Sequence, residues 1–399
     1  MNEEVLQYIK THWEKTIKPA NRLAPFPFNS PSETEHYVDF YYWDLYFINK
    51  GLLLTGLDAQ AENNLKDMDY FVKKYGYVPN SDILLNRSQP PVFTLAVWDL
   101  YEYRKDKKVL ETYIPSLLEE HEFFIKNRNT PYGLGAFGSS ATDEEIMEHY
   151  EDLSSRVLEY SDDPKEQYQI GKDILAIAES GLDFNLRFRT KDSKIAAHEF
   201  LHLDLNSWLY AVEDRLGEML SLLGREEESK EFHSMKEARK KKMEEYFFDE
   251  RKGIYLDYNF VTKEHSSLIT AVSLYPFALG VSNEKERALR VLPYLEMAKG
   301  LSCAEKHPGP VFYQWDYPTM WGETTLMAYL ALKNVGALKE AQRIKEKYME
   351  TIERQFLKTG RLWEKYNALD GSIMNVEYVA PPFMGWTAAA YQIFANEKE

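Results

Sequence analysis

The chain has 399 residues, a net charge of −16 and a single cysteine, and 44% of its residues are hydrophobic. This length and composition are those of a globular protein with a large buried core, and the acidic charge argues against a nucleic-acid partner because it repels phosphate backbones. One cysteine, Cys303, excludes an internal disulfide and a metal site built from several cysteines.

The first residues and the cysteine count bear on where the protein works. Residues 1–17 are charged and amphipathic, and they lack the long apolar stretch of a secretory signal. A single cysteine also suits a reducing compartment. No run of about 18 apolar residues occurs, so we expect no membrane span and no membrane partner. The sequence therefore predicts a cytoplasmic protein.

Helical periodicity dominates the chain, because apolar residues recur three and four positions apart in about a dozen segments. The clearest segments are residues 43–56, 92–104, 168–179, 202–223, 266–280, 320–334 and 337–355. Alternation typical of strands is confined to short stretches near residues 253–260 and 361–367, which we expect to form hairpins.

So many helices without a dividing linker leave a solenoid, a bundle or a closed α/α barrel open. No repeat of about 34 or 40 residues is visible, which argues against a solenoid and against a helical-repeat interaction protein. In a closed double ring of helices, the loops gather at one end, and a site there draws single residues from the whole chain. The polar and aromatic motifs described next have that distribution.

The first motif, YYWDLYF at residues 41–47, places Trp43 and Asp44 at the beginning of an apolar helix. Aspartate is a common helix cap and tryptophan a common core residue. The motif alone therefore favours a structural role over a site.

The second motif combines Asn80 with the NRSQPP stretch at residues 86–91. Arg87, Ser88 and Gln89 form a dense polar run before two prolines that suit the first turn of the next helix. Such a run is as consistent with ligand binding as with a solvated loop.

The third motif is ESGLDF at residues 179–184, where a helix ends, Gly181 turns the chain and Asp183 follows between two apolar residues. Partial desolvation raises the pKa of a carboxyl group, and a general acid at neutral pH needs a raised pKa. A helix cap or a surface aspartate is the alternative interpretation.

Two further motifs lie near the end of the chain. QWDYP at residues 314–318 surrounds Asp316 with aromatic residues, among them Trp315, that suit either a sugar-stacking wall or ordinary loop packing. Downstream, Glu377 and Tyr378 precede a Pro-Pro turn, and Trp386 stands at the beginning of a helix. Glu364 is a second carboxylate candidate in this region.

Two carboxylates far apart in the sequence, set among aromatic loops, fit glycoside hydrolysis. One protonates the leaving oxygen and the other activates a water, with the two groups roughly 6.5–9.5 Å apart in inverting enzymes. The nine histidines contain no HExxH pattern and no other close ligand cluster. No GxSxG motif or Gly-rich phosphate loop occurs. We therefore expect neither a metal nor a cofactor.

Together these segments resemble the trehalase family of glycoside hydrolases. YYWDLYF resembles the end of that family's first signature, and QWDYP resembles the core of its second. The remaining matches follow in the family's order: NRSQPP, ESGLDF, DLNSWLY at 204–210, EKYN at 364–367 and the EY…GW spacing at 377–386. The resemblance spans about residues 25–395.

The resemblance implies an all-α fold, a single (α/α)6 barrel over residues 1–399 with short loop hairpins at the active-site end. It implies hydrolysis with inversion, with Asp183 as general acid and Glu377 as general base. The substrate contacts that it implies are Trp43, Asp44, Asn80, Arg87, Ser88, Gln89 and Gly181, and the wall or its surroundings include Trp315, Asp316, Tyr378 and Trp386.

Two departures from the family pattern concern the leaving group. His36 stands where the family's first signature has an arginine, and residues 138–146 replace a segment that carries Arg-Pro-Glu. The resemblance therefore implies that the pocket for the sugar that loses its bond is retained, while the leaving-group pocket differs.

We expect a small α-linked glucoside as the substrate, with α,α-trehalose first. One alternative is a related glycosidase that acts on glucosylglycerate, mannosylglycerate or an α-linked oligosaccharide. A second alternative, of another class, is a non-catalytic carbohydrate-binding protein on the same barrel, which would lack the acid or the base.

Overall fold

The computed structural model describes residues 2–308 and 313–397, and helices dominate these ranges. The α-helices are α1 (Glu3–His12), α2 (Tyr42–Thr55), α3 (Asp58–Tyr75), α4 (Phe93–Arg104), α5 (Lys107–Asn127), α6 (Asp143–Val157), α7 (Pro164–Glu179), α8 (Leu203–Leu222), α9 (Glu226–Phe247), α10 (Tyr275–Ala278), α11 (Lys285–Leu295), α12 (Gly322–Asn334), α13 (Leu338–Thr359) and α14 (Gly385–Asn396).

Short strands lie in the connections between the helices, and all of their pairings are antiparallel. The paired strands are β1 (Ile17–Lys18) with β2 (Phe28–Asn29), β3 (Phe200–Leu201) with β6 (Tyr258–Asn259) and β6 with β7 (Glu264–His265), β4 (Phe248–Asp249) with β5 (Ile254–Tyr255), and β8 (Thr319–Trp321) with β9 (Lys365–Asn367).

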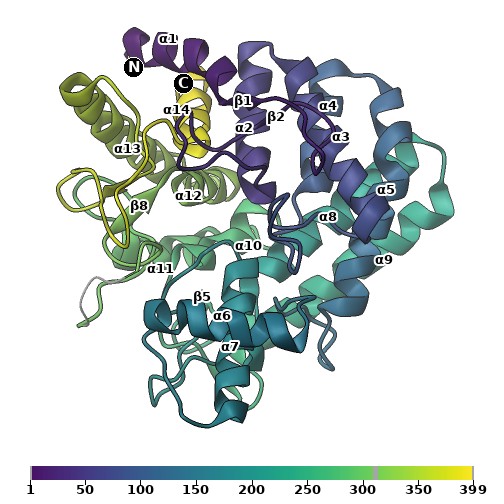
Figure 1. Ribbon diagram of the computed structural model, residues 1–399, viewed down its shortest axis with the longest axis vertical. Helices are drawn as coiled ribbons and strands as arrows, with labels where there is room; N and C mark the ends of the chain where they lie inside the picture. The colour runs from purple at the N-terminus through teal and green to yellow at the C-terminus, as the bar shows by residue number, and fades with distance from the viewer. Residues whose placement is uncertain (1, 309–312, 398–399) are drawn as a thin grey trace.

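Six helices form a closed inner ring in the order α2, α4, α8, α10, α12 and α14, with α14 packing back onto α2. Outer helices cover the joints: α3 contacts α2 and α4, α5 contacts α4 and α8, and α13 contacts α12 and α14. The first and last helices, α1 and α14, lie side by side (Figure 1), and the Asn2 amide donates to the Tyr391 hydroxyl over 3.0 Å. This alternation of inner and outer helices is the (α/α)6 barrel that the sequence predicts.

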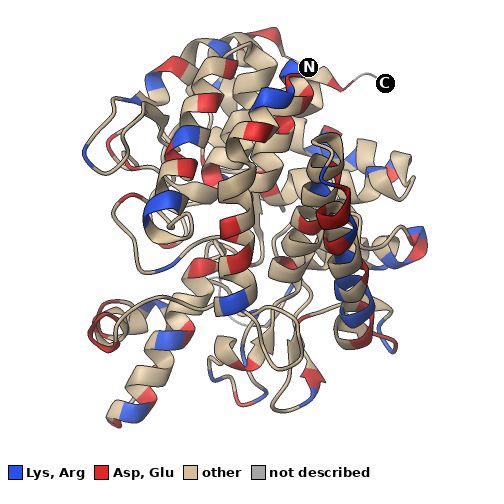
Figure 2. Cartoon of the chain, turned by 90° about the vertical axis from the view of Figure 1, so that its right-hand side faces the viewer, with Lys and Arg blue, Asp and Glu red and all other residues tan. Residues whose placement is uncertain are grey.

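The pattern of buried residues explains why apolar spacing in the sequence predicts these helices. The outer helix α13 buries one stripe, Ala341, Ile344, Tyr348 and Ile352, spaced three and four residues apart. The inner helix α2 is buried on nearly every face. Charges of both signs run along the outer helices (Figure 2). Within residues 2–308 and 313–397, no helix combines the length and apolar character that a membrane span needs.

One expected element differs in the structure, and another has an additional partner. The prediction of one helix over 266–280 is wrong, since only a 3-10 turn at Ala271–Leu274 and α10 form there. The preceding backbone pairs with another loop, with the Glu305 amide donating to the Ile269 carbonyl over 2.8 Å. Burial against that loop gives the segment its apolar spacing. The stretch 361–367 forms the expected local hairpin, since Tyr366 pairs with Ile373 across a turn, and β9 also pairs with the distant strand β8.

Helices α6 and α7 pack on each other and form an extra hairpin between α5 and α8, at the bottom of Figure 1. The chain that leaves α7 is fixed by Arg187, which is 1% exposed. Its guanidinium donates to both oxygens of Asp204 over 2.6 and 2.8 Å and to both oxygens of Asp257 over 2.5 and 2.6 Å. This cation therefore ties the segment after α7 to α8 and to the loop before β6.

Replacing Arg187 with methionine should leave the Asp204 and Asp257 carboxylates buried without their cation. Breaking a buried ion pair from one side costs about 3–5 kcal/mol, so the urea midpoint of unfolding should fall strongly. The control is Arg343→Met, which removes a partly exposed pair with Glu296 and should cost about 0–1 kcal/mol. Equal midpoints for the two variants would contradict the role of Arg187.

Candidate active site

Loops from distant parts of the chain enclose a cavity of about 150 Å³ next to the first turns of α2 and α14. Most of the residues predicted from the motifs line it: Trp43, Asp44, Asn80, Arg87, Gln89, Gly181, Asp183, Trp315, Tyr378 and Trp386. The structure therefore brings together side chains from nearly every motif.

Four tryptophans form an aromatic cluster beside the cavity. Trp315 and Trp321 stack with their ring centroids 3.9 Å apart, and Trp386 stands edge-on to both of them. Trp43 is 5.8 Å from Trp315 between centroids. Among the described residues, the indole N–H groups of Trp43 and Trp386 have no hydrogen-bond partner. Flat apolar faces with unused polar edges suit a sugar ring.

Gly181 lets the end of α7 pass against this cluster. Its φ is +76°, in the left-handed region that glycine favours. A Cβ atom at this position would lie 2.6 Å from the Trp43 ring. The close approach of backbone and ring leaves no room for a side chain, and Asp183, two residues further on, lines the cavity.

Asp183 is partly exposed to the cavity. Burial raises its pKa from 3.8 to about 6, Arg156 lowers the pKa, Glu377 raises it and Arg87 lowers it. The backbone carbonyl of Asp183 accepts a hydrogen bond from the Gln314 side chain over 2.9 Å. A carboxyl group that keeps its proton up to about pH 6 can act as a general acid.

Glu377 does not line the cavity, and its side chain is 12% exposed. Its φ of +65° is unusual for a residue with a side chain. One carboxylate oxygen accepts the Gln314 backbone N–H over 2.9 Å, and the other accepts Nε of Arg156 over 3.0 Å and also its Nη2. Gln314 thus contacts the Asp183 segment with its side chain and Glu377 with its backbone.

A buried polar network, defined here as the Lys365 network, supports the same wall. Lys365 donates to the Gln314 side chain over 2.6 Å and pairs with Glu364 over 3.0 Å. The hydroxyl of Tyr378 donates to Glu364 over 2.7 Å, and Tyr37 donates to Tyr378 over 2.9 Å. Burial lowers the pKa of Lys365 and raises that of Glu364. Glu364, a carboxylate candidate in the sequence, is therefore engaged by Lys365 and Tyr378 in the wall of the cavity.

Arg87 and the end of α7 are joined through Glu179, which is fully buried. The Glu179 carboxylate accepts Nε and Nη2 of Arg128 over 2.6 and 2.7 Å. It also accepts the backbone N–H of Ser88 over 2.9 Å and that of Gly138 over 2.7 Å. Arg87 is 7% exposed, and its Nε has no partner among the described residues.

Ser88, a predicted contact, and Asp316, predicted for the wall or its surroundings, do not line the cavity. The hydroxyl of Ser88 donates to the Val78 carbonyl over 2.6 Å, so this residue holds its own loop. Asp316 is 1% exposed, pairs with His307 over 3.1 Å and accepts the Tyr317 N–H over 2.7 Å. Hydrogen bonding to Asp316 raises the pKa of His307. Both residues orient loops beside the cavity.

The two sequence departures also have clear positions. His36 is exposed at the rim, with its ring 5.4 Å from that of Tyr378, and it does not line the cavity. In the stretch 138–146, Thr142 and Glu145 form a capping box that begins α6. The stretch therefore supplies a helix start where the family pattern has an arginine.

Three polar residues at the site were not among the predictions. Gln314 and Lys365 lie inside the QWDYP and EKYN motifs, so the sequence did point to the loops that carry them. Arg156 lies on α6, where the sequence has no matching motif, and only the fold brings it to Glu377.

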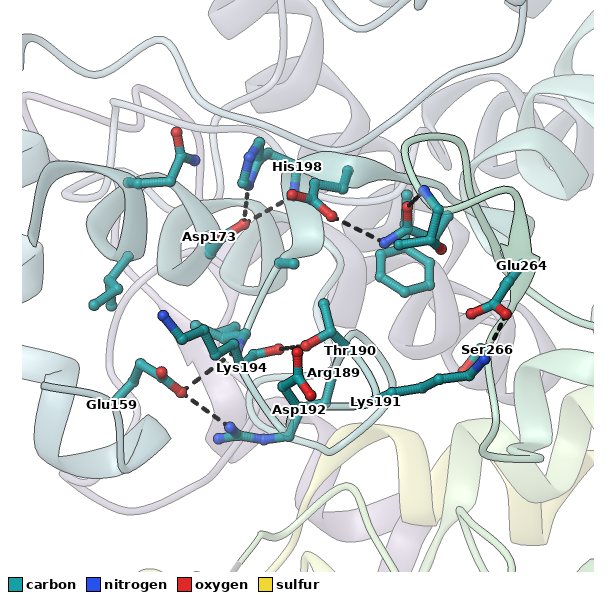
Figure 3. Close-up of a pocket in the computed structure, with 18 of the residues that line it drawn as sticks. Glu159, Asp173, Arg189, Thr190, Lys191, Asp192, Lys194, His198, Glu264 and Ser266 are labelled. Carbon is teal, nitrogen blue, oxygen red and sulfur yellow. Dashed lines mark hydrogen bonds and ion pairs between the residues drawn. The ribbon is translucent and has the colours of Figure 1, made fainter. Parts of the chain in front are cut away.

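A larger hollow of about 680 Å³ lies elsewhere, on the segments around β3, β6 and β7 (Figure 3). Several of its charged side chains pair with one another, among them His198 with Asp173 over 2.6 Å and Arg189 with Glu159 over 3.1 Å. It contains neither Asp183 nor Glu377. The smaller cavity is therefore the candidate active site. Among the residues that the structure describes, no group of three or more His, Cys, Asp or Glu is arranged to hold a metal ion.

Asp183→Asn should stabilise the protein at neutral pH. The folded-state pKa of about 6 lies above the ordinary 3.8, so stability falls as pH rises between these values and the full cost is present above pH 6. At pH 7.5 the neutral variant should have a higher urea midpoint, because its free energy of unfolding should be larger by about 1–3 kcal/mol. At pH 3.5 its midpoint should be nearly that of wild type. A gain of equal size at both pH values would contradict the raised pKa.

The family model described as Trehalase matches residues 6–397. The chain is 26% identical over 424 aligned residues to a periplasmic trehalase of Xanthomonas oryzae pv. oryzae, covering 98% of this chain and 72% of the relative. A periplasmic trehalase of Xanthomonas axonopodis pv. citri matches with the same identity and coverage.

These relatives correct the expectation of a cytoplasmic location, because both are named as periplasmic enzymes. The cysteine argument fails for a physical reason. One buried cysteine has no partner for an intramolecular disulfide, so the cysteine count is the same in an oxidising and in a reducing compartment.

Solved structures agree on the fold. The neutral trehalase Nth1 of Saccharomyces cerevisiae matches with a TM-score of 0.76 and 20% identity, over 97% of this chain and 79% of that one. A GH63 mannosylglycerate hydrolase of Thermus thermophilus matches with a TM-score of 0.66 and 18% identity, over 97% of this chain and 100% of that one. The chain belongs to the trehalase family of glycoside hydrolases and has their (α/α)6 barrel.

Proposed function

We propose that this chain, as one catalytic domain, hydrolyses α,α-trehalose with inversion, and that Asp183 is the general acid and Glu377 the general base. The observation that carries the proposal is the pairing of two unlike carboxyl groups across Gln314. Asp183 has a pKa raised to about 6, whereas the Glu377 carboxylate accepts three N–H donors, which fix its orientation. A carboxyl group with a raised pKa suits the acid role, and a carboxylate that donors hold in place suits the base role.

The proposed reaction is a single displacement. The water oxygen bonds to the anomeric carbon on the face opposite the glycosidic oxygen, and Glu377 takes one proton from that water. As the bond between the anomeric carbon and the glycosidic oxygen breaks, Asp183 gives its proton to the departing oxygen. The products are one glucose with inverted anomeric configuration and one glucose that keeps its own. Solvent then returns a proton to Asp183 and removes one from Glu377.

The cavity supports binding of one sugar ring. Its volume of about 150 Å³ lies below the range of about 300–1,000 Å³ that is usual for larger ligands. Trp43 and Trp386 offer apolar faces to the ring, while Asp44, Arg87 and Gln89 offer polar groups to its hydroxyls. The second sugar then lies toward the opening, on the side of His36.

The opening is also where the alternative substrates differ. The family arginines expected at His36 and in the stretch 138–146 are absent, which favours a second candidate, a glycosidase that acts on glucosylglycerate, mannosylglycerate or an α-linked oligosaccharide. A non-catalytic sugar-binding protein is disfavoured, because Asp183 and Glu377 are both present and contact the same residue, Gln314.

A substrate panel tests the proposal. Wild-type protein should release glucose from α,α-trehalose faster than from glucosylglycerate, mannosylglycerate or maltose. Asp183→Asn and Glu377→Gln should each lower kcat on trehalose by at least about 10²–10⁴-fold, since each removes one proton transfer. The measurement is the initial rate of glucose release, together with a circular dichroism spectrum for each variant.

Asp152→Asn on the exposed face of α6 is the matched control and should keep the wild-type rate. If wild type cleaved another panel member instead of trehalose, and both active-site variants lost that activity, the acid and base assignments would stand and trehalose would be rejected as the substrate. Near-wild-type turnover in both variants would reject the assignment of the carboxyl groups.

A further inference from the structure

Arg156 lies in the last turn of α6, outside every motif that resembles the family, yet it contacts Glu377 directly. We propose that Arg156 is a positioning residue for the hydrolysis: it orients the Glu377 carboxylate toward the attacking water and places one positive charge between the two carboxyl groups. The inference rests on the proposed roles of Asp183 and Glu377.

The hydrogen bonds around Glu377 leave a defined place for the water. Arg156 donates Nε and Nη2 to the same carboxylate oxygen, Oε2, and the Gln314 N–H donates to Oε1 over 2.9 Å. A carboxylate has about four lone-pair sites, and these three donors use both sites of Oε2 and one of Oε1. Among the described contacts, the remaining acceptor site is on Oε1, so Arg156 determines which oxygen receives the water proton.

Arg156 is itself held in place. Its guanidinium lies 4.7 Å from the centre of the Phe184 ring, directly after Asp183 in the chain. The carbonyl of Val157, which ends α6, accepts hydrogen bonds from Nη2 of Arg189 and from the Tyr313 hydroxyl. Arg189 also pairs with Glu159, as Figure 3 shows. The end of α6 is therefore fixed by contacts other than the one between Arg156 and Glu377.

Arg156 is the cation that contacts Glu377 directly and that lowers the pKa of Asp183 most strongly. Lys365 is held by Glu364, and Arg87 acts on Asp183 less strongly than Arg156 does. The remaining titratable groups are Asp44, Tyr37 and Tyr41, which face Asp183, Tyr313, which faces Glu377, and Tyr378, which faces Arg156. None of these carries positive charge, so loss of Arg156 leaves Arg87 near Asp183 and, near Glu377, only Lys365, which is paired with Glu364.

The test compares Arg156→Gln with Arg156→Lys by the pH dependence of kcat/KM on the panel substrate that wild type cleaves best. Glutamine should lower kcat about 10–100-fold with KM nearly unchanged, because the base is misplaced. It should also move the alkaline limb of the profile up by about one pH unit, because a cation that lowers the pKa of Asp183 is gone. Lysine keeps the charge but not the fork of donors, so it should restore the limb and only part of the rate.

Arg104→Gln is the matched control, since Arg104 pairs with Asp58 and Glu62 on the outer side of α3 and α4, and it should leave rate and profile unchanged. A glutamine variant that loses activity while its alkaline limb stays at the wild-type pH would overturn the proposal and leave Arg156 a purely structural residue. Equal shifts of the limb in the glutamine and lysine variants would also overturn the proposal.

A readout without substrate separates this inference from the proposed function. Carbon-13 NMR titration of the Asp183 carboxyl, assigned with Asp183→Asn, should give a higher pKa in Arg156→Gln than in wild type. If wild type cleaves no member of the panel, the proposed function fails while this titration still decides the electrostatic role of Arg156. An unchanged Asp183 pKa would overturn that role.

Discussion

The Glu179 carboxylate at the end of α7 is the interaction on which the rest of the site depends. It accepts four N–H donors from three separate segments: two from Arg128 at the end of α5, one from Ser88 before α4, and one from Gly138 before α6. Because a buried carboxylate is stable only when such donors surround it, the three segments are fixed relative to α7. That arrangement sets Arg87 beside the turn at Gly181 and therefore beside Asp183.

Burial and charge act against each other at Asp183. The aromatic cluster and the barrel remove water from the carboxyl group, which raises its pKa, while Arg156 and Arg87 limit the rise. A general acid needs both effects, because full desolvation alone gives a weak proton donor and full exposure gives an ionised group at neutral pH. The stability that the folded protein loses by holding this group is typical of active sites. The Arg187 ion pairs and the Glu179 hydrogen bonds supply compensating rigidity next to it.

Much of the fold follows from the sequence, because the helices that bury one stripe or all of their faces reveal themselves by apolar spacing, as α13 and α2 do. The failure at 266–280 has the same origin, since backbone pairing with another loop buries residues at similar intervals without forming a helix. The motifs located most of the cavity lining because loops at one end of a barrel converge. They could not locate Arg156, because its role depends on the length and direction of α6 after the capping box at Thr142. They also placed Ser88 among the contacts and Asp316 in the wall or its surroundings, whereas the side chains of both hold loops, since a motif does not say which way a side chain points.

At the centre of the proposed mechanism, one water, activated by Glu377, displaces the leaving sugar that Asp183 protonates. Proton NMR of the first turnovers on α,α-trehalose tests this step most directly, because the anomeric protons of the two glucose forms are resolved before mutarotation mixes them. A single displacement gives α-glucose and β-glucose in equal amounts at the start of the reaction. Release of α-glucose alone would mean retention through a covalent intermediate and would contradict the roles assigned to both carboxyl groups.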